Sequence, residues 1–251
     1  MKNLKEFAKL EKPVVGTWVS LTDPGVIEFV KWAGFDFVCL DNEYFPFDPN
    51  MMGQMIRTAN NLEIPLIIRI SRMEDISTLI NFGTDGIMIP DCTFERAKDA
   101  VERIKYAPIG MRSMFATSRS MRVSGLGFKE YHKQANDHVT LLVQIEGKRG
   151  MEDLDKILSL DGVDMVCTGR YDISQSLGVP CEANHPMVDE FEDIVIKKTI
   201  DAGKIPFLGG NEKEAQDILS RQNVRMVIVS RDTAILTSGF ASIVTNLTKR
   251  S

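Results

Sequence analysis

Eight short apolar segments recur along the chain, and several are apolar at nearly every position, as in PLIIRI, GIMIP and RMVIV. Strands that are buried on both faces have this composition, because helices cover both sides of a parallel sheet. The pattern predicts strands over Val14–Ser20, Asp36–Asp41, Pro65–Ile70, Gly86–Pro90, Val139–Glu146, Asp164–Thr168, Ile205–Gly209 and Arg225–Ser230.

Segments with helical periodicity separate these strands. Apolar residues recur at helical spacing in Pro24–Ala33, Phe94–Ile104 and Met187–Ala202. Thr93 precedes the second of these helices as a predicted N-cap, and Gly203 follows the third as a predicted C-cap. Eight strands that alternate with helices over 251 residues predict one (β/α)8 TIM-barrel domain over the whole chain, 1–251. A doubly wound sheet is the alternative, but the count of eight and the uniform composition favour the barrel.

Two additions to the barrel are expected. The interval between the fourth and fifth predicted strands is about twice the usual one, which indicates an insertion near Ala107–His138, before strand five. Its loop carries Arg112, Arg119 and Arg122, which could reach a substrate or a neighbouring subunit, or could form solvated salt bridges. Met1–Leu10 is predicted to be an N-terminal amphipathic helix that closes the bottom of the barrel.

Composition and charge narrow the classes of protein. The 35 acidic and 30 basic residues give a net charge of −5, without the basic cluster that nucleic-acid binding requires. No apolar run approaches the ~18 residues of a membrane-spanning helix, and the charged first segment is not typical of a signal peptide. The four cysteines form no CxxC pair and do not predict a zinc site. We therefore expect a cytoplasmic protein that contacts neither nucleic acid nor membrane.

Polar residues follow several of the predicted strands, at the end of the barrel where such enzymes hold their catalytic groups. Glu146 and Asp172 follow neighbouring strands, so their carboxylates can converge. Two carboxylates without a nearby histidine suit Mg²⁺ or Mn²⁺, although each could instead cap a helix or pair with an arginine. Arg69 ends the third strand, where it either pairs with a carboxylate or binds an anionic substrate through two nitrogens.

Two further strand ends carry candidate groups. Asp41 and Glu43 end the second strand, where they could hold a water molecule or pair with Arg69. Tyr44 is interpreted as a packing residue or hydrogen-bond donor, because an unperturbed phenol titrates near ~10. Gly209–Asn211, after the seventh strand, could hold a phosphate as in phosphosugar enzymes, or could be a simple strand-to-helix turn.

Five sequence segments stand in a specific order and spacing: GTWVSLTDP (16–24), GFDFVCLDNE (34–43), PLIIR (65–69), LLVQIE (141–146) and GVDMVCTGRYDISQSLG (162–178). Together they resemble the HpcH/HpaI aldolase family of metal-dependent 2-oxo-acid aldolases, which includes the 2,4-dihydroxyhept-2-enedioate aldolases. Any one segment is a weak signal, but the set covers nearly the whole chain.

The resemblance implies a barrel that binds pyruvate through a divalent cation, Mg²⁺ or Mn²⁺, with Co²⁺ as a third candidate. Glu146 and Asp172 match the family's metal ligands, and Arg69 matches the arginine that stabilises the enolate. Four residues match positions around the substrate, namely Trp18 in the pocket wall, Gln144 beside the substrate, and Gly169 and Tyr171 at its carboxylate. The resemblance also implies a homo-oligomer, a hexamer or another trimer-based assembly, with Thr233–Leu247 as an exchanged helix.

The chain departs from the family at the second strand. The family reads Asp-Gly-Glu-His there, with the histidine assisting proton transfer, whereas this chain reads Asp41-Asn42-Glu43-Tyr44. The acidic partner of that histidine aligns with Asn81. We therefore expect the catalytic set Arg69, Asp41 and Tyr44 to stabilise an enolate but to remove a hydroxyl proton poorly.

The sequence thus predicts a metal-dependent (class II) aldolase-like carbon–carbon lyase. Its substrates would be small 2-oxo acids, like pyruvate or oxaloacetate, together with an aldehyde, and it would also decarboxylate oxaloacetate. The alternative is a non-catalytic barrel that binds a 2-oxo acid and has lost the proton-transfer pair.

Overall fold

The computed structural model describes residues 3–7, 9–220 and 224–248. Eight parallel strands close into a barrel in chain order, and the pairing of β1 with β8 completes the ring. The strands are β1 (Val14–Val19), β2 (Phe37–Asp41), β3 (Leu66–Arg69), β4 (Gly86–Ile89), β5 (Thr140–Ile145), β6 (Met165–Thr168), β7 (Ile205–Gly210) and β8 (Met226–Arg231). All eight predicted strands are confirmed to within one residue at each end, and the doubly wound alternative is wrong.

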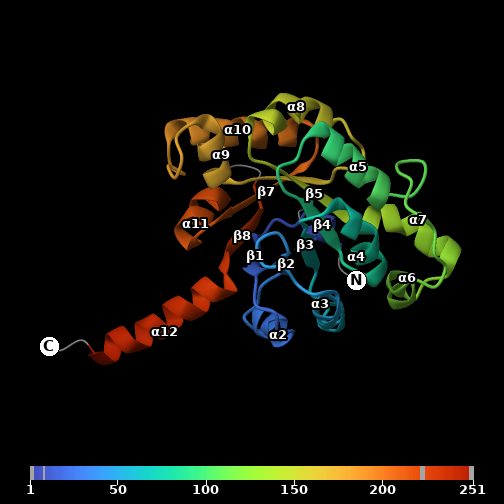
Figure 1. The fold of residues 1–251 in the computed structure, drawn as a ribbon, viewed down its shortest axis with the longest axis horizontal. Coiled ribbons are helices and arrows are strands. Elements are labelled where there is room, and N and C mark those ends of the chain that lie inside the picture. The colour runs from blue at the N-terminus through green and yellow to red at the C-terminus, as the bar shows by residue number, and fades with distance from the viewer. Residues whose placement is uncertain (1–2, 8, 221–223, 249–251) are drawn as a thin grey trace.

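Helices surround the barrel, and the last one extends away from it (Figure 1). They are α1 (Leu4–Phe7), α2 (Gly25–Trp32), α3 (Pro49–Asn61), α4 (Ile76–Phe82), α5 (Phe94–Ile104), α6 (Arg119–Ser124), α7 (Phe128–His138), α8 (Lys148–Leu158), α9 (Arg170–Leu177), α10 (Pro186–Asp201), α11 (Glu212–Ser220) and α12 (Asp232–Thr248), with a 3₁₀ turn at Met73–Asp75. Within the described ranges, none of these helices has the length and apolar character needed to cross a bilayer.

The three helices predicted between strands agree with the structure to within one residue at each end, but one predicted cap differs. Thr93 is the N-cap residue of α5, but its side chain makes no capping hydrogen bond. Instead, Asp153 Oδ2 from α8 accepts a hydrogen bond of 3.0 Å from the backbone N–H of Phe94. Gly203, just after α10, has a φ of +70°, a left-handed conformation that glycine adopts without steric cost.

The barrel interior is filled by side chains from alternate strand positions. Phe37, Ile67, Leu142 and Phe207 belong to this inner cluster and are buried. Leu4 of α1 is fully buried in the same cluster, so α1 covers the N-terminal end of the barrel. The helix is shorter than the predicted 1–10 segment, and residues 1, 2 and 8 of that prediction lie outside the described residues.

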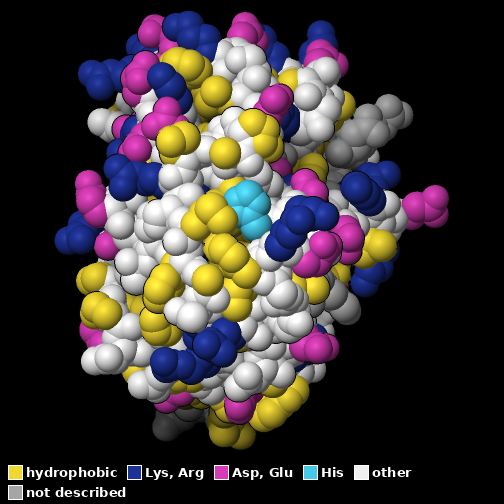
Figure 2. All heavy atoms as spheres, turned by 90° about the vertical axis from the view of Figure 1, so that its right-hand side faces the viewer, with side chains coloured by type: hydrophobic (Ala, Val, Ile, Leu, Met, Phe, Trp, Pro, Cys, Tyr) yellow, Lys and Arg dark blue, Asp and Glu magenta, His cyan; other side chains and the backbone are white. Residues whose placement is uncertain are grey.

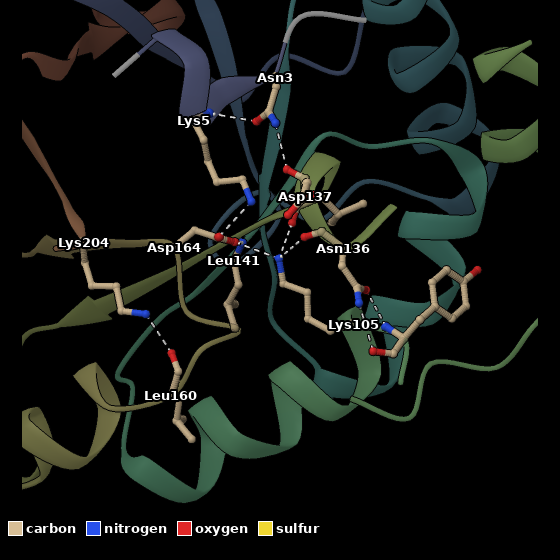
Figure 3. Close-up of polar contacts among 11 residues, drawn as sticks. Asn3, Lys5, Lys105, Asn136, Asp137, Leu141, Leu160, Asp164 and Lys204 are labelled. Carbon is tan, nitrogen blue, oxygen red and sulfur yellow. Dashed lines mark hydrogen bonds and ion pairs between the residues drawn. The ribbon is translucent and has the colours of Figure 1, made fainter. Parts of the chain in front are cut away.

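A polar network ties the elements together beneath the barrel (Figure 3). Asp164, just before β6, accepts from Lys105 Nζ at 2.9 Å and from Lys5 Nζ at 3.1 Å. Lys105 is buried and also donates to the main-chain oxygens of Asn136 and Val139, at 2.8 and 2.7 Å. Burial lowers the pKa of Lys105 despite its carboxylate partner. The network joins α1, α5 and α7 to the start of β6.

The segment between α5 and β5 adds α6 and α7 to the outside of the barrel. Arg112 Nη2 donates to Asn81 Oδ1 at 3.0 Å and to Tyr131 at 3.3 Å, and Arg119 Nη1 donates to Asn60 Oδ1 at 2.6 Å. These two arginines therefore bind α3, α4 and α7 of their own chain. Figure 2 shows that hydrophobic side chains gather on the face that carries these helices.

Candidate active site

The C-terminal ends of the strands surround a cavity of about 480 Å³, which is a typical volume for a small-molecule site. It extends from Gly169 at the end of β6, past Arg69, to Arg231 at the end of β8. All four residues predicted around the substrate line it, namely Trp18, Gln144, Gly169 and Tyr171. A second hollow adjoins the first, is lined by Glu43, Tyr44, Asp91 and Glu146, and shares Asp172 with it.

Glu146 and Asp172 converge on Gly169, as their strand positions predict. A Cβ atom built on Gly169 would collide with Glu146 Oε2 and would lie 2.8 Å from Gln144 Nε2 and 3.4 Å from Asp172 Oδ2. Three polar side chains from β5, the β5–α8 junction and α9 therefore meet around one backbone position. Only glycine leaves room for them there, because any side chain would occupy the space between the oxygens.

Glu146 is held in place and poorly solvated. Its Oε1 atom accepts a hydrogen bond of 2.7 Å from the backbone N–H of Asp91, and the residue is 8% exposed. Burial raises the pKa of Glu146 to about 8, and the nearby charge of Asp172 acts in the same direction. The Asp91 contact opposes this shift. A cation beside Oε2 would compensate the buried charge.

The residues present fit a divalent cation. Glu146 and Asp172 offer carboxylate oxygens, the donors that Mg²⁺ and Mn²⁺ prefer. Over the described ranges, no group of three or more His, Cys, Asp and Glu residues is arranged to hold a metal, so the protein would supply two ligands and leave the others to water or substrate. Gln144 Oε1 is buried and has no hydrogen-bond partner in the described chain, which indicates a polar group missing from the site.

Arg69 is fixed on two sides and still lines the cavity. Its Nη2 and Nε atoms lie 2.8 Å and 3.1 Å from the two carboxylate oxygens of Asp41, and Nε lies 3.2 Å from Glu43 Oε2. The guanidinium carbon is 4.5 Å from the ring centre of Trp18 and 5.0 Å from that of Tyr44. Both alternatives for Arg69 are therefore realised, because it pairs with a carboxylate and also faces the cavity.

Asp41 and Tyr44 lie in different environments beside Arg69. Asp41 is fully buried and does not line the cavity, so its geometry is that of a residue that positions Arg69. Tyr44 is 62% exposed, and the charge of Glu43, followed by burial, raises its pKa. Its phenol is therefore a poor base at neutral pH. Asn81 lies in the last turn of α4, at the opposite end of the barrel from Tyr44.

The turn after β7 is closed by its own side chains. The backbone N–H of Asn211 donates to Glu214 Oε2 at 2.8 Å, and the backbone N–H of Glu214 donates to Asn211 Oδ1 at 3.0 Å. This reciprocal pair is a capping box. Because Glu214 places a carboxylate at the start of α11, the site would repel a phosphate, and the interpretation as a strand-to-helix turn is the better one.

Residues 15–223 match the HpcH/HpaI aldolase/citrate lyase family. The chain belongs to this family. It is 31% identical to a 2-keto-3-deoxy-L-rhamnonate aldolase of Salmonella typhi, covering 95% of this chain and 90% of that protein. It is also 31% identical to a 4-hydroxy-2-oxo-heptane-1,7-dioate aldolase of Salmonella arizonae, covering 95% of this chain and 92% of that protein. An HpcH/HpaI aldolase structure from Desulfitobacterium hafniense superposes with a TM-score of 0.93 at 25% identity, covering 100% of this chain and 98% of the other. These relatives support an aldolase or lyase activity for this chain.

Three residues of this HpcH/HpaI barrel escaped the sequence analysis. Asp91 acts through its backbone N–H, which no sequence pattern reveals. Arg170 donates to Glu192 Oε1 at 2.9 Å, to Ala183 O at 3.0 Å and to Asp189, and thereby anchors the start of α9 on α10. Arg231 lies one residue beyond the predicted end of the eighth strand, at the mouth of the cavity. A strand predicted one residue longer would have placed it there.

Proposed function

We propose that the protein is a divalent-metal-dependent carbon–carbon lyase that acts on 2-oxo acids through a pyruvate enolate. The observation that carries the proposal is the convergence of Glu146, Asp172 and Gln144 on Gly169, in a cavity that Arg69 also lines. Divalent-metal dependence is general in the HpcH/HpaI family, and Mg²⁺, Mn²⁺ or Co²⁺ would suit these oxygen ligands.

The residues of the site match the charge changes of the reaction. Cleavage that releases pyruvate leaves negative charge on the enolate oxygen. A divalent ion held by Glu146 and Asp172 would supply Lewis-acid polarisation of the 2-oxo group. Arg69 would stabilise the same developing charge, and its pairs with Asp41 hold it in place before the reaction begins. The first backbone N–H groups of α9, at Tyr171 and its neighbours, would bind the substrate carboxylate.

The position that matches the family's proton-transfer histidine carries a poor base for a substrate hydroxyl. Tyr44 stands where the family has histidine, and its raised pKa keeps the phenol protonated. Decarboxylation of oxaloacetate needs enolate stabilisation but no removal of a hydroxyl proton. We therefore propose that oxaloacetate decarboxylation is faster than cleavage of 4-hydroxy-2-oxo acids to pyruvate and an aldehyde.

Exchange of the methyl protons of pyruvate tests the proposal directly. Pyruvate in D₂O with Mg²⁺ or Mn²⁺ should lose its methyl proton signal when wild-type protein is added, because enolisation exchanges these protons. Arg69→Met should retain metal binding and lose the exchange. Saturable pyruvate binding without any exchange would instead support the alternative of a non-catalytic 2-oxo-acid-binding barrel, which the poor base at Tyr44 favours.

The last helix supports a homo-oligomer. Its first residue, Asp232, is the one buried residue that the structure describes in α12. Exposed apolar side chains lie along the rest of it, namely Ile235, Leu236, Phe240, Ile243, Val244 and Leu247. A single helix with such a surface is marginally stable in water on its own. We propose that it packs on another copy of the chain in a hexamer or trimer-based assembly, which light scattering after size-exclusion chromatography would measure.

The proposed setting is the cytoplasm. Four free cysteines, of which Cys39, Cys92 and Cys167 are buried, suit a reducing compartment. The proposed partners are accordingly small 2-oxo acids, an aldehyde and other copies of the chain.

A further inference from the structure

Three arginines line the cavity, and they differ in how many of their nitrogens have a partner in the described chain. Arg170 donates hydrogen bonds to Glu192, to Asp189 and to the main-chain oxygen of Ala183. Arg69 uses two nitrogens on Asp41 and lies between two aromatic rings. For Arg231, the ion pair found in the described chain joins Nη1 to Asp41 Oδ2, at 2.8 Å. Among the residues that the structure describes, the other nitrogens of Arg231 have no hydrogen-bond or ion-pair partner.

Arg231 is held as a rigid group at the end of β8. Its guanidinium carbon lies 4.9 Å from the ring centre of Phe45 and 5.7 Å from that of Trp18. The side chain is 26% exposed and belongs to the cavity wall. A planar cation held between rings and a carboxylate presents its free edge in a fixed direction, which suits bidentate recognition of a second carboxylate.

The local charges leave Arg231 with excess positive charge. Asp41 is a single carboxylate, and it lies 2.8 Å from a nitrogen of Arg69 and 2.8 Å from a nitrogen of Arg231. One negative charge cannot neutralise two guanidinium groups. Arg69 has Glu43 as a second partner at 3.2 Å, whereas Arg231 has none among the residues that the structure describes.

We propose that Arg231 binds a second, distal carboxylate of the substrate, so that the site prefers 2-oxo diacids over 2-oxo monoacids. The inference rests on the proposed function, in which the 2-oxo acid group binds near Gly169. The same cavity extends from Gly169 to Arg231, and Glu214 at the start of α11 also lines it, beside Gly210. One extended dianion can therefore contact both ends.

Fluorescence of Trp18 can report binding. The chain has two tryptophans, and Trp32 is 69% exposed on α2, away from the cavity. In a Trp32→Phe background with Mg²⁺, the signal would come from Trp18 alone. Two ligand pairs of equal chain length isolate the distal carboxylate: 2-oxoglutarate against 2-oxopentanoate, and oxaloacetate, by rapid mixing, against 2-oxobutanoate.

We expect the background protein to bind the diacid of at least one pair about tenfold more tightly than its monoacid. Arg231→Gln should bring that ratio close to one with little change in monoacid Kd. Arg231→Lys should give an intermediate ratio, because it keeps the charge but loses the fork. The control Arg72→Gln removes an exposed arginine that pairs with Asp75, and it should leave the ratio unchanged.

Two outcomes would overturn the assignment while leaving the proposed function intact. One is binding of 2-oxo acids without preference for a diacid. The other is an Arg231→Gln variant that weakens both ligands of a pair equally, which would mean that Arg231 only balances the charge of Asp41. If the background protein bound no 2-oxo acid in the presence of Mg²⁺, the proposed function and this inference would both fail.

Discussion

Arg69 and Asp41 form a two-nitrogen, two-oxygen pair, with Nη2–Oδ2 at 2.8 Å and Nε–Oδ1 at 3.1 Å. Asp41 is fully buried, so the pair is shielded from solvent on the carboxylate side. The two residues are neighbours in the β2–β3 register, which sets their backbones side by side. The sheet itself therefore fixes the position of this arginine.

Replacing Arg69 by lysine should lower kcat by at least about tenfold, because a point charge cannot reproduce the planar fork between Asp41 and the substrate. Initial rates of oxaloacetate decarboxylation and the Tm should be measured on one preparation. A fall in Tm with an unchanged kcat for the folded fraction would assign Arg69 a structural role only.

Glu146→Gln and Asp172→Asn should each weaken Mg²⁺ or Mn²⁺ binding and abolish turnover, while the far-UV circular dichroism stays that of the wild type. Each substitution removes one of the two carboxylates that meet at Gly169. Calorimetric metal titration measures the effect, with the exposed Glu152→Gln on α8 as a matched control. Wild-type metal affinity in both variants would contradict the assigned ligands.

Metal binding should depend on pH through Glu146. Because the metal-free pKa of Glu146 is about 8, a cation must displace a proton at neutral pH, and Mg²⁺ affinity should rise with pH up to about 8. Titration in two buffers of different ionisation enthalpy would count the released proton. Glu146→Gln should release none.

The same shift has a stability consequence in metal-free protein. The pKa of Glu146 is raised from 4.5, so between 4.5 and about 8 the folded state binds more protons than the unfolded state. The stabilising contribution is complete below pH 4.5 and is lost as the pH rises through about 8. Urea unfolding in EDTA at several pH values should show this decline, and the decline should be smaller in Glu146→Gln.

Tyr44→His should raise aldol cleavage selectively, because it supplies a base near neutral pH at the end of β2. A missing general base typically costs about 10²–10⁴-fold in rate, whereas decarboxylation should change little. The ratio of pyruvate release from a 4-hydroxy-2-oxo acid to that from oxaloacetate is the measurement. Fast wild-type cleavage that Tyr44→Phe leaves unaffected, with negligible decarboxylation, would show that proton transfer does not depend on this strand end.

Lys105→Met should destabilise the protein by about 2–4 kcal/mol without altering the site at the other end of the barrel. It leaves the main-chain oxygens of Asn136 and Val139 without their buried donor. Urea midpoints measure the loss, with the exposed Lys133→Met as the control. A midpoint equal to that of the wild type would mean that water replaces the ammonium group.

The barrel was predictable because segments such as PLIIRI and GIMIP are apolar at nearly every position, and burial on both faces leaves few alternatives. The approach of Glu146 to Asp172 was also predictable, because both residues follow neighbouring parallel strands whose C-terminal ends lie at the same end of the barrel. Contacts that depend on side-chain packing between distant elements were not predictable. Asp153 replaces Thr93 in capping α5, and the second cation at Asp41 comes from β8, 190 positions along the sequence.

Arg231 and Asp232 are consecutive, so the cavity wall and the first residue of α12 share one peptide bond. Asp232 also accepts from the backbone N–H groups of Ser20 and Leu21 at the end of β1, at 2.9 and 2.8 Å. If α12 packs on a neighbouring copy, as proposed, that copy would contact the segment that carries Arg231. Substrate selection would then be linked to self-association, and dilution of the protein would change its preference among 2-oxo acids.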